Sequence, residues 1–170
     1  MTETQEQTRS RTFSWSDPAL TAARIGTTSG LEMLHAMGTG EIPAPPILQL
    51  VGATGMEVEQ GRVTVLMAAQ EFHYNPLGTV HGGIIATLLD TAAGCTVHST
   101  LPAGFGYTSL DLMTRFIKPV TIKSGLLRCE GAIISRGRRT AVAESRLFDE
   151  AGALLAHATS TCLIFELPTA

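Results

Sequence analysis

The hydrophobic and polar positions of the chain follow successive patterns. Two strand-like runs over residues 56–69 flank Gln60-Gly61, where the glycine gives the freedom that a hairpin turn requires. Residues 82–100 lack proline and are dominated by Ile, Leu, Ala and Thr, which predicts one long buried helix. Hydrophobic and polar residues then alternate in three runs, over residues 107–118, 123–135 and 139–165. The last run is broken by a turn at residues 149–152, so the pattern predicts four strands in a meander.

The N-terminal part of the chain carries helix signals. Ser16-Asp17-Pro18 predicts a helix from residue 18 toward residue 26. Ser29 and Glu32 have capping-box spacing and predict a second helix, which ends at the glycines of residues 38–40. Three prolines within residues 42–46 predict an extended linker. We therefore expect a disordered tail, a helical extension and a main domain, over residues 1–16, 17–44 and 45–166.

The order of these elements predicts an α+β fold. One helix between a hairpin and a meander cannot cover both faces of a large sheet, so a curved antiparallel sheet must wrap around the helix. Small helix residues allow the strands to approach closely: Ala86, Ala92, Ala93 and Gly94.

Composition narrows the class of protein. A chain of 170 residues suits one domain, and its 44% hydrophobic content predicts apolar surface that meets a second copy. A net charge of -3 without a clustered basic face argues against nucleic acid and anionic membranes as partners. No apolar run approaches the roughly 20 residues that cross a bilayer. Three cysteines without metal-ligand spacing indicate reduced thiols in a cytoplasmic protein, and we expect neither a metal nor a bound cofactor.

Two consecutive glycines, Gly82 and Gly83, open the long helix. The first N–H groups of a helix lack backbone partners and attract negative charge. Without a side chain in the way, the oxygen of a ligand could reach these amides, as the carbonyl of a thioester would require. The alternative is an ordinary glycine-rich loop.

Asp90 is a lone carboxylate within an apolar helix, so it needs a partner or a purpose. The residues three and four positions away are small, which predicts a shallow trough that a substrate could enter: Ala86, Thr87, Ala93 and Gly94. Two interpretations stay open, a catalytic carboxylate and an acid paired with a buried arginine.

Helix geometry separates these two features. Gly82 and Asp90 are eight residues apart, which corresponds to about 12 Å along the helix. One helix cannot easily present both groups to one atom. If both act on the same thioester, the amide comes from one subunit and the carboxylate from the other, across a two-fold axis.

Three motifs occur in order along the chain: Asn75-Pro76-x-Gly78-x-Val80-His81-Gly82-Gly83, Leu89-Asp90-x-Ala92, and Ser109-Leu110-Asp111-Leu112 through Phe116-x-Lys118-Pro119. Their order and spacing resemble the hotdog-fold thioesterases of the phenylacetate-degradation type, within the 4-hydroxybenzoyl-CoA thioesterase superfamily. The resemblance extends over residues 45–165. It implies an antiparallel hotdog sheet around a central helix, dimers that assemble as homotetramers, and hydrolysis of aryl- or medium-chain acyl-CoA.

The resemblance also implies roles by position. Asp90 matches the catalytic acid, as nucleophile or general base, and Gly82 the residue whose amide polarises the thioester carbonyl. Asn75 matches a side chain that positions water or the thioester, His81 a supporting residue, and Ser109 a hydroxyl near the carboxylate, for which the adjacent Thr108 is the alternative.

Other interpretations of the helper residues stay open. His81 could bind the loop backbone, and Asn75 could be a turn residue. Coenzyme A carries several phosphates, and Gly83 and three basic residues could hold them, although the basic residues could equally be solvated: Lys118, Arg138 and Arg139.

Two other functions fit the same fold. A non-catalytic acyl-CoA-binding module would not need a carboxylate that faces the reacting carbon. A hotdog dehydratase would need a His and acid pair arranged to remove a proton. The joint presence of Asn75, Gly82 and Asp90 favours the hydrolase.

Overall fold

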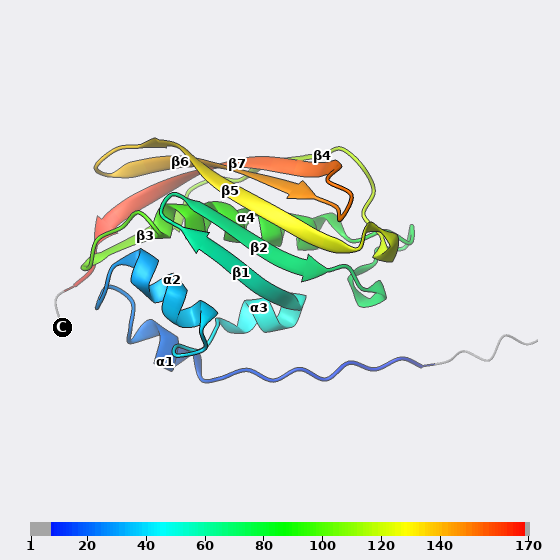
Figure 1. Ribbon diagram of the computed structural model, residues 1–170, viewed down its shortest axis with the longest axis horizontal. Coiled ribbons are helices and arrows are strands. Elements are labelled where there is room, and N and C mark those ends of the chain that lie inside the picture. The colour runs from blue at the N-terminus through cyan, green and yellow to red at the C-terminus, as the bar shows by residue number, and fades with distance from the viewer. Residues whose placement is uncertain (1–7, 169–170) are drawn as a thin grey trace, which may run out of the picture.

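The computed structural model describes residues 8–168, which form one antiparallel sheet around a central helix (Figure 1). The helices are α1 (Pro18–Ala22), α2 (Gly30–Gly38), α3 (Pro46–Val51) and α4 (Gly82–His98), with two 3-10 turns, η1 (Glu71–His73) and η2 (Ile122–Ser124). The strands are β1 (Ala53–Glu59), β2 (Arg62–Ala68), β3 (Phe105–Ser109), β4 (Met113–Phe116), β5 (Leu126–Arg136), β6 (Thr140–Phe148) and β7 (Leu154–Glu166). Residues 1–7 of the expected tail lie outside the described part.

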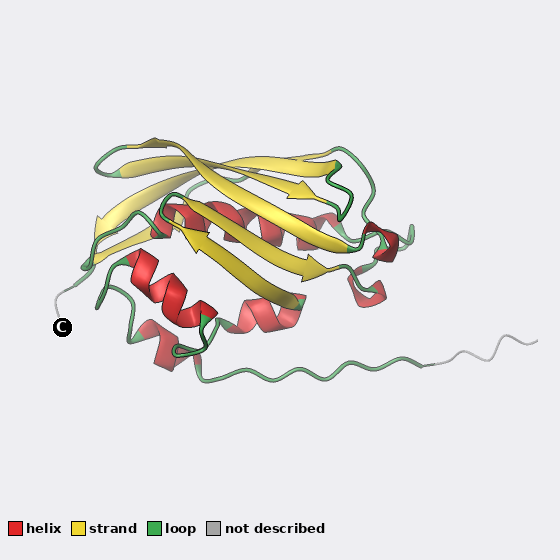
Figure 2. Cartoon of the chain, viewed as in Figure 1, coloured by secondary structure: helices red, strands yellow, loops and turns green. Residues whose placement is uncertain are grey.

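The seven strands confirm the curved antiparallel sheet and the long helix that it wraps (Figure 2). Their order is β1-β2-β5-β6-β7-β3, and β4 also pairs with β7. The prediction of a four-strand meander is therefore correct for β5, β6 and β7 and wrong for the run over residues 107–118. That run splits into two strands at the far edge of the sheet.

The split between β3 and β4 follows from hydrogen bonds between Asp111 and β7. The carboxylate oxygen Oδ1 of Asp111 accepts a hydrogen bond from the Thr161 amide at 2.9 Å. The Ser160 hydroxyl donates to the Asp111 carbonyl at 2.8 Å. Because these bonds hold residue 111 against β7, the chain leaves the regular strand geometry between Ser109 and Met113.

The expected hairpin and the second N-terminal helix are both confirmed. Gly61 has a φ of 77°, the left-handed conformation of the β1–β2 turn. Ser29 and Glu32 form the reciprocal capping box ahead of α2. Helix α3, in contrast, was not expected: it begins at the last residue of the predicted linker. Pro45 is its N-cap, Pro46 occupies the first helical position, where its fixed φ favours a helix, and Gly52 ends it in a left-handed conformation.

The sheet touches α4 most closely where glycines lie. A Cβ atom on Gly131 of β5 would lie only 2.5 Å from the carbonyl oxygen of Ala92. A Cβ atom on Gly94 would lie 2.6 Å from the hydroxyl oxygen of Tyr107. The core around this contact is fully buried, with Leu88 and Leu89 among its members. The expected close approach of small residues is confirmed at these positions.

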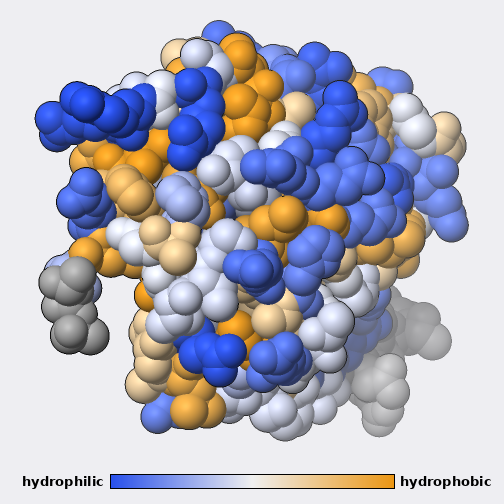
Figure 3. All heavy atoms as spheres, turned by 60° about the vertical axis from the view of Figure 1, so that its left-hand side comes forward, coloured by the Kyte–Doolittle hydropathy of each residue, from blue (hydrophilic) through white to orange (hydrophobic). Residues whose placement is uncertain are grey.

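The surface bears hydrophobic patches separated by hydrophilic side chains, as the face in Figure 3 shows. The edge of the sheet formed by β3 and β4 is particularly apolar: Leu110, Met113, Phe116 and Ile117 are all exposed there. Within residues 8–168 both strands pair only with β7. No helix in that range is both long and apolar enough to cross a membrane.

Candidate active site

Asp90 lies half-buried near the middle of α4. The Ser109 hydroxyl donates a hydrogen bond to the Asp90 oxygen Oδ1 at 3.0 Å. This contact distinguishes Ser109 from Thr108, the alternative that the sequence left open. Among the described residues no basic side chain forms an ion pair with Asp90, so the predicted alternative of a buried arginine partner is absent there.

Asp90 faces a hollow of about 540 Å³, called here the acid hollow. Its lining comes from three places: Ala86, Thr87 and Asp90 on α4, residues 109–112 from the last residue of β3 onward, and Ile47 on α3. The expected trough of small residues is therefore correct for the N-terminal side of Asp90. It is wrong for the C-terminal side, because Ala93 and Gly94 are both buried and do not line the hollow.

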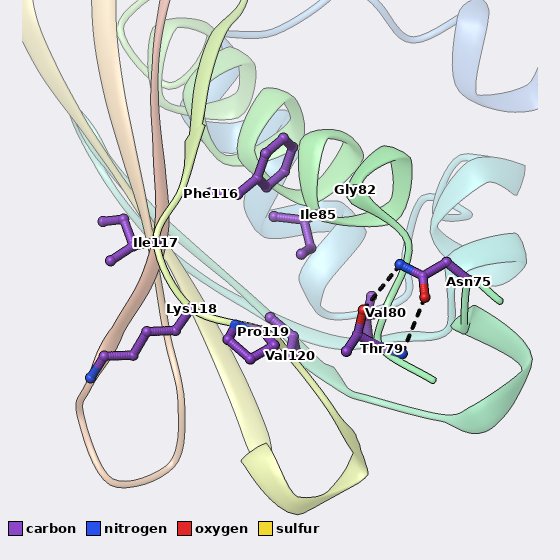
Figure 4. A pocket seen from close by; sticks show the side chains of 10 residues that line it. All are labelled: Asn75, Thr79, Val80, Gly82, Ile85, Phe116, Ile117, Lys118, Pro119 and Val120. Atoms are coloured by element: carbon purple, nitrogen blue, oxygen red, sulfur yellow. Dashed lines mark hydrogen bonds between the residues drawn. The ribbon is translucent and has the colours of Figure 1, made fainter. Parts of the chain in front are cut away.

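The start of α4 borders a second hollow, of about 350 Å³, called here the amide hollow (Figure 4). His81 caps the helix, and its ring nitrogen Nδ1 accepts a hydrogen bond from the Gly83 amide at 2.9 Å. The Gly82 amide donates to no residue in the described range. As the first N–H group of the helix, it remains available to an oxygen that enters the amide hollow.

Asn75 organises the loop in front of the helix (Figure 4). Its oxygen Oδ1 accepts hydrogen bonds from the amides of Leu77 at 2.9 Å and Thr79 at 3.3 Å. Its nitrogen Nδ2 donates to the Thr79 hydroxyl at 3.0 Å. Asn75 is thus bonded as a turn residue, and His81 binds the backbone at the start of the helix. These contacts are the structural alternatives to a direct catalytic role that the sequence left open for the two residues. One Asn75 amide hydrogen stays free of these bonds.

The basic residues expected at one rim lie in different places. Lys118 is exposed and lines the amide hollow, and its side chain extends away from Gly82 in Figure 4. Arg138 and Arg139 border a separate hollow of about 410 Å³, beside residues 163–166 of β7. Within one chain, therefore, the three do not form a single cluster. Gly83 lies in neither group; it borders a hollow beneath α3.

The acid hollow and the amide hollow share no lining residue. This separation agrees with the rise of about 12 Å expected between residues eight positions apart on a helix. Cys95, which is half-buried close to Asp90, is a poor competing nucleophile, because burial and the nearby carboxylate raise the pKa of its thiol to about 12. Residues 8–168 contain no group of His, Cys, Asp and Glu side chains suited to a metal ion.

Comparison with known proteins places this arrangement in a family. A family model described as the thioesterase superfamily matches residues 77–156. A Bacillus halodurans protein solved with CoA is 31% identical with a TM-score of 0.64, over 74% of this chain and 82% of that one. The chain belongs to the thioesterase superfamily. A Ralstonia eutropha structure, described as a phenylacetic acid degradation-related protein and candidate thioesterase, is 29% identical with a TM-score of 0.70, over 76% and 98% of the two chains.

A curated relative from Halobacterium salinarum adds a partial match. It is described as a candidate esterase and is 38% identical over 69 residues. The match covers 39% of this chain and 44% of that relative. This match is too short to identify the whole fold, which is identified by the solved structures and the family model.

Proposed function

We propose that this protein hydrolyses acyl-CoA thioesters to a free acid and coenzyme A, at a site built from two copies of the chain. The observation that carries the proposal is Asp90, an acid with no basic partner among residues 8–168, oriented by Ser109 at the edge of an open hollow. The free amide of Gly82 supplies the complementary electrophilic group. The relative from Bacillus halodurans was solved with CoA, which supports coenzyme A as part of the substrate.

In the proposed reaction the Gly82 amide donates to the thioester oxygen as negative charge develops on it. The Asp90 carboxylate acts in one of two ways. As nucleophile it bonds to the carbonyl carbon, the coenzyme A thiolate leaves, and water cleaves the resulting anhydride. As general base it takes a proton from water, the hydroxide adds to the carbon, and the departing thiolate receives that proton. In both routes the Ser109 hydrogen bond holds the carboxylate in position.

The loop residues present the Gly82 amide. His81 occupies the Gly83 amide, so the Gly82 amide is left for the substrate. Asn75 braces the same loop and keeps one amide hydrogen for water or the thioester. We assign the phosphates of coenzyme A to the basic residues Lys118, Arg138 and Arg139, which would come together from different copies. Gly83, the other candidate, is less suited, because its amide is already bonded to His81.

The edge of the sheet indicates how two copies meet. Phe116 of β4 borders the amide hollow, and Leu110 after β3 borders the acid hollow. Both hollows thus open beside the same apolar edge, whose strands pair on one side only within the described part. A second copy on this edge would cover Met113 and Ile117 and could bring its acid hollow to the amide hollow of the first.

Further parts of the proposal rest on the sequence. They are a tetramer formed from two such dimers, a cytoplasmic location that suits the free cysteines, and the division into a tail, a helical extension and a thioesterase domain at residues 16 and 44.

Thiol release from a panel of acyl-CoA esters tests the function. Asp90→Asn should lower kcat by about 10²- to 10⁴-fold, because the amide can neither attack nor take a proton. The thermal midpoint should stay near that of the wild type, since Asp90 is only half-buried. Asp111→Asn is the matched control: this residue lines the same hollow, its amide oxygen can still accept from Thr161, and its effect should be far smaller. Turnover by Asp90→Asn at nearly the parental rate would refute the assignment.

A further inference from the structure

Helix α3 forms a roof over the acid hollow. Ile47 of α3 and Thr87 of α4 line this hollow and also line a neighbouring hollow of about 370 Å³. Because the two share these residues, they are parts of one groove between α3 and α4, called here the α3 groove. The neighbouring part extends to the start of α4, where Gly83 and Ile84 border it.

The α3 groove is long and apolar. Gly83, Thr87 and Asp90 follow one face of α4, and the first and last of them are seven positions apart, which corresponds to about 10 Å along the helix. The opposite wall is aliphatic and aromatic, and its side chains are exposed: Ile47 is 44% exposed, Leu50 49% and Phe72 49%. Apolar side chains that are left open beside a reactive group provide binding surface for an apolar part of its substrate.

The N-terminal segment holds the roof in place. Helix α3 has six residues, of which only Val51 is buried, so its own packing anchors it weakly. The Arg11 guanidinium donates to the carbonyl oxygens of Gln49 at 2.7 Å and Leu50 at 2.6 Å. It also lies 4.1 Å from the centre of the Phe72 ring. Arg11 thereby satisfies carbonyls at the end of α3 and ties this helix to Phe72, in the same wall of the groove.

We infer that the α3 groove holds the acyl chain of the substrate and that Ile47 determines which chains fit. The preferred substrates are then extended aliphatic acyl-CoA esters, since the groove is elongated and its roof is aliphatic. A chain whose carbonyl carbon lies beside Asp90 passes directly under Ile47 as it enters the groove. This inference rests on the proposed function and adds the acyl class and the residue that selects it.

The test compares thiol release from octanoyl-CoA and acetyl-CoA, because only the longer chain reaches beneath α3. The wild type should prefer octanoyl-CoA. Ile47→Trp narrows the groove, and Ile47→Asn places a polar group where the chain would cover it. Each should lower the ratio of kcat/KM for octanoyl-CoA over acetyl-CoA by about tenfold or more. Both changes are at an exposed position, so a thermal melt should show a folded protein.

Ile25 supplies matched controls. It is 43% exposed, nearly as much as Ile47, and borders none of the hollows described above. Ile25→Trp and Ile25→Asn should leave the ratio of the wild type unchanged. If the two Ile47 variants release thiol with the ratio of the wild type, the groove assignment is wrong and the hydrolase stands. If the wild type cleaves aryl-CoA esters but neither of these two, the groove assignment is also wrong and the hydrolase stands. If it releases thiol from no ester of the wider panel, both proposals fail.

Discussion

Small residues lie on two faces of α4 in opposite surroundings. On the face toward β5, Ala92 is fully buried, and Gly131 allows the strand to approach the helix backbone. On the other face, Ala86 and Thr87 border the acid hollow beside Asp90. Small side chains serve close packing on one face and access to a carboxylate on the other. Changes on the first face should therefore affect stability, and changes on the second should affect turnover.

The largest of the remaining effects is expected at the open end of the helix. Gly82→Pro deletes the amide hydrogen, while proline suits the first helical position and His81 already has the extended backbone that precedes proline. Loss of one donor to the thioester oxygen should cost about 2.7 to 4 kcal/mol in the barrier for kcat. Steady-state kinetics of thiol release would measure this loss.

Gly82→Ala separates the amide from the side chain. Its Cβ atom would lie 3.2 Å from the Phe116 ring, as the proline Cβ would, but the N–H group remains. Alanine should therefore retain much more activity than proline. Equal losses in the two variants would indicate that crowding against Phe116, and not the amide, controls turnover.

A smaller effect, of the opposite kind, is expected on the sheet face. Gly131→Ala should destabilise the fold by about 1 to 3 kcal/mol, because the new methyl group would clash with the Ala92 carbonyl oxygen. Denaturant unfolding would measure the loss, and kcat below the melting range should change little. Gly38→Ala in α2 is the control: its Cβ atom would meet nothing within 4 Å, so stability should be kept. A Gly131→Ala variant that is stable but inactive would contradict the division between the faces.

The smallest effect is a dependence of the free energy of unfolding on pH, which arises from His73 near the start of α4. His73 is buried, its Nε2 pairs with the Val51 carbonyl at 2.9 Å, and its own carbonyl accepts from the His81 amide at 2.8 Å. Burial lowers the pKa of His73 below its ordinary value of 6.5. The unfolded chain therefore binds a proton first as the pH falls. Stability from the neutral ring should be complete above about pH 6.5 and decrease as the pH drops below it.

Denaturant unfolding at several pH values would measure how steeply the free energy of unfolding falls as the pH drops. His73→Gln should flatten this slope without removing it, since burial also lowers the pKa of His98 at the other end of α4. An unchanged slope in the variant would assign the pH dependence to His98 or to other groups.

Local signals in the sequence were sufficient for most elements. The capping box of Ser29 and Glu32, the turn at Gly61 and the length of α4 each depend on residues close together in the chain. The pairing of β3 and β4 with β7 depends on distant partners such as Asp111 and Thr161, which no local pattern reveals. Helix α3 was missed because its prolines are typical of linkers as well as of first helical turns.

For the candidate site, the sequence located the groups but not their surroundings. The separation of Gly82 from Asp90 followed from helix geometry alone. The alternation of β3 could not decide between Thr108 and Ser109, whereas the hydrogen bond to Asp90 does. The contribution of Ile47 to the acid hollow could not be predicted either, because it depends on where a six-residue helix packs.

Activity in a mixture of two inactive variants tests most directly whether one site uses two copies. Asp90→Asn removes the carboxylate of the site, and Gly82→Pro removes the amide. When the two variants are refolded together, some dimers should contain one copy of each. In such a dimer one of the two sites has both the intact carboxylate and the intact amide, and the other site has neither. Random pairing predicts about a quarter of the wild-type rate of thiol release from the mixture, far above either variant alone. A mixture no more active than the average of the two separate variants would contradict the shared site.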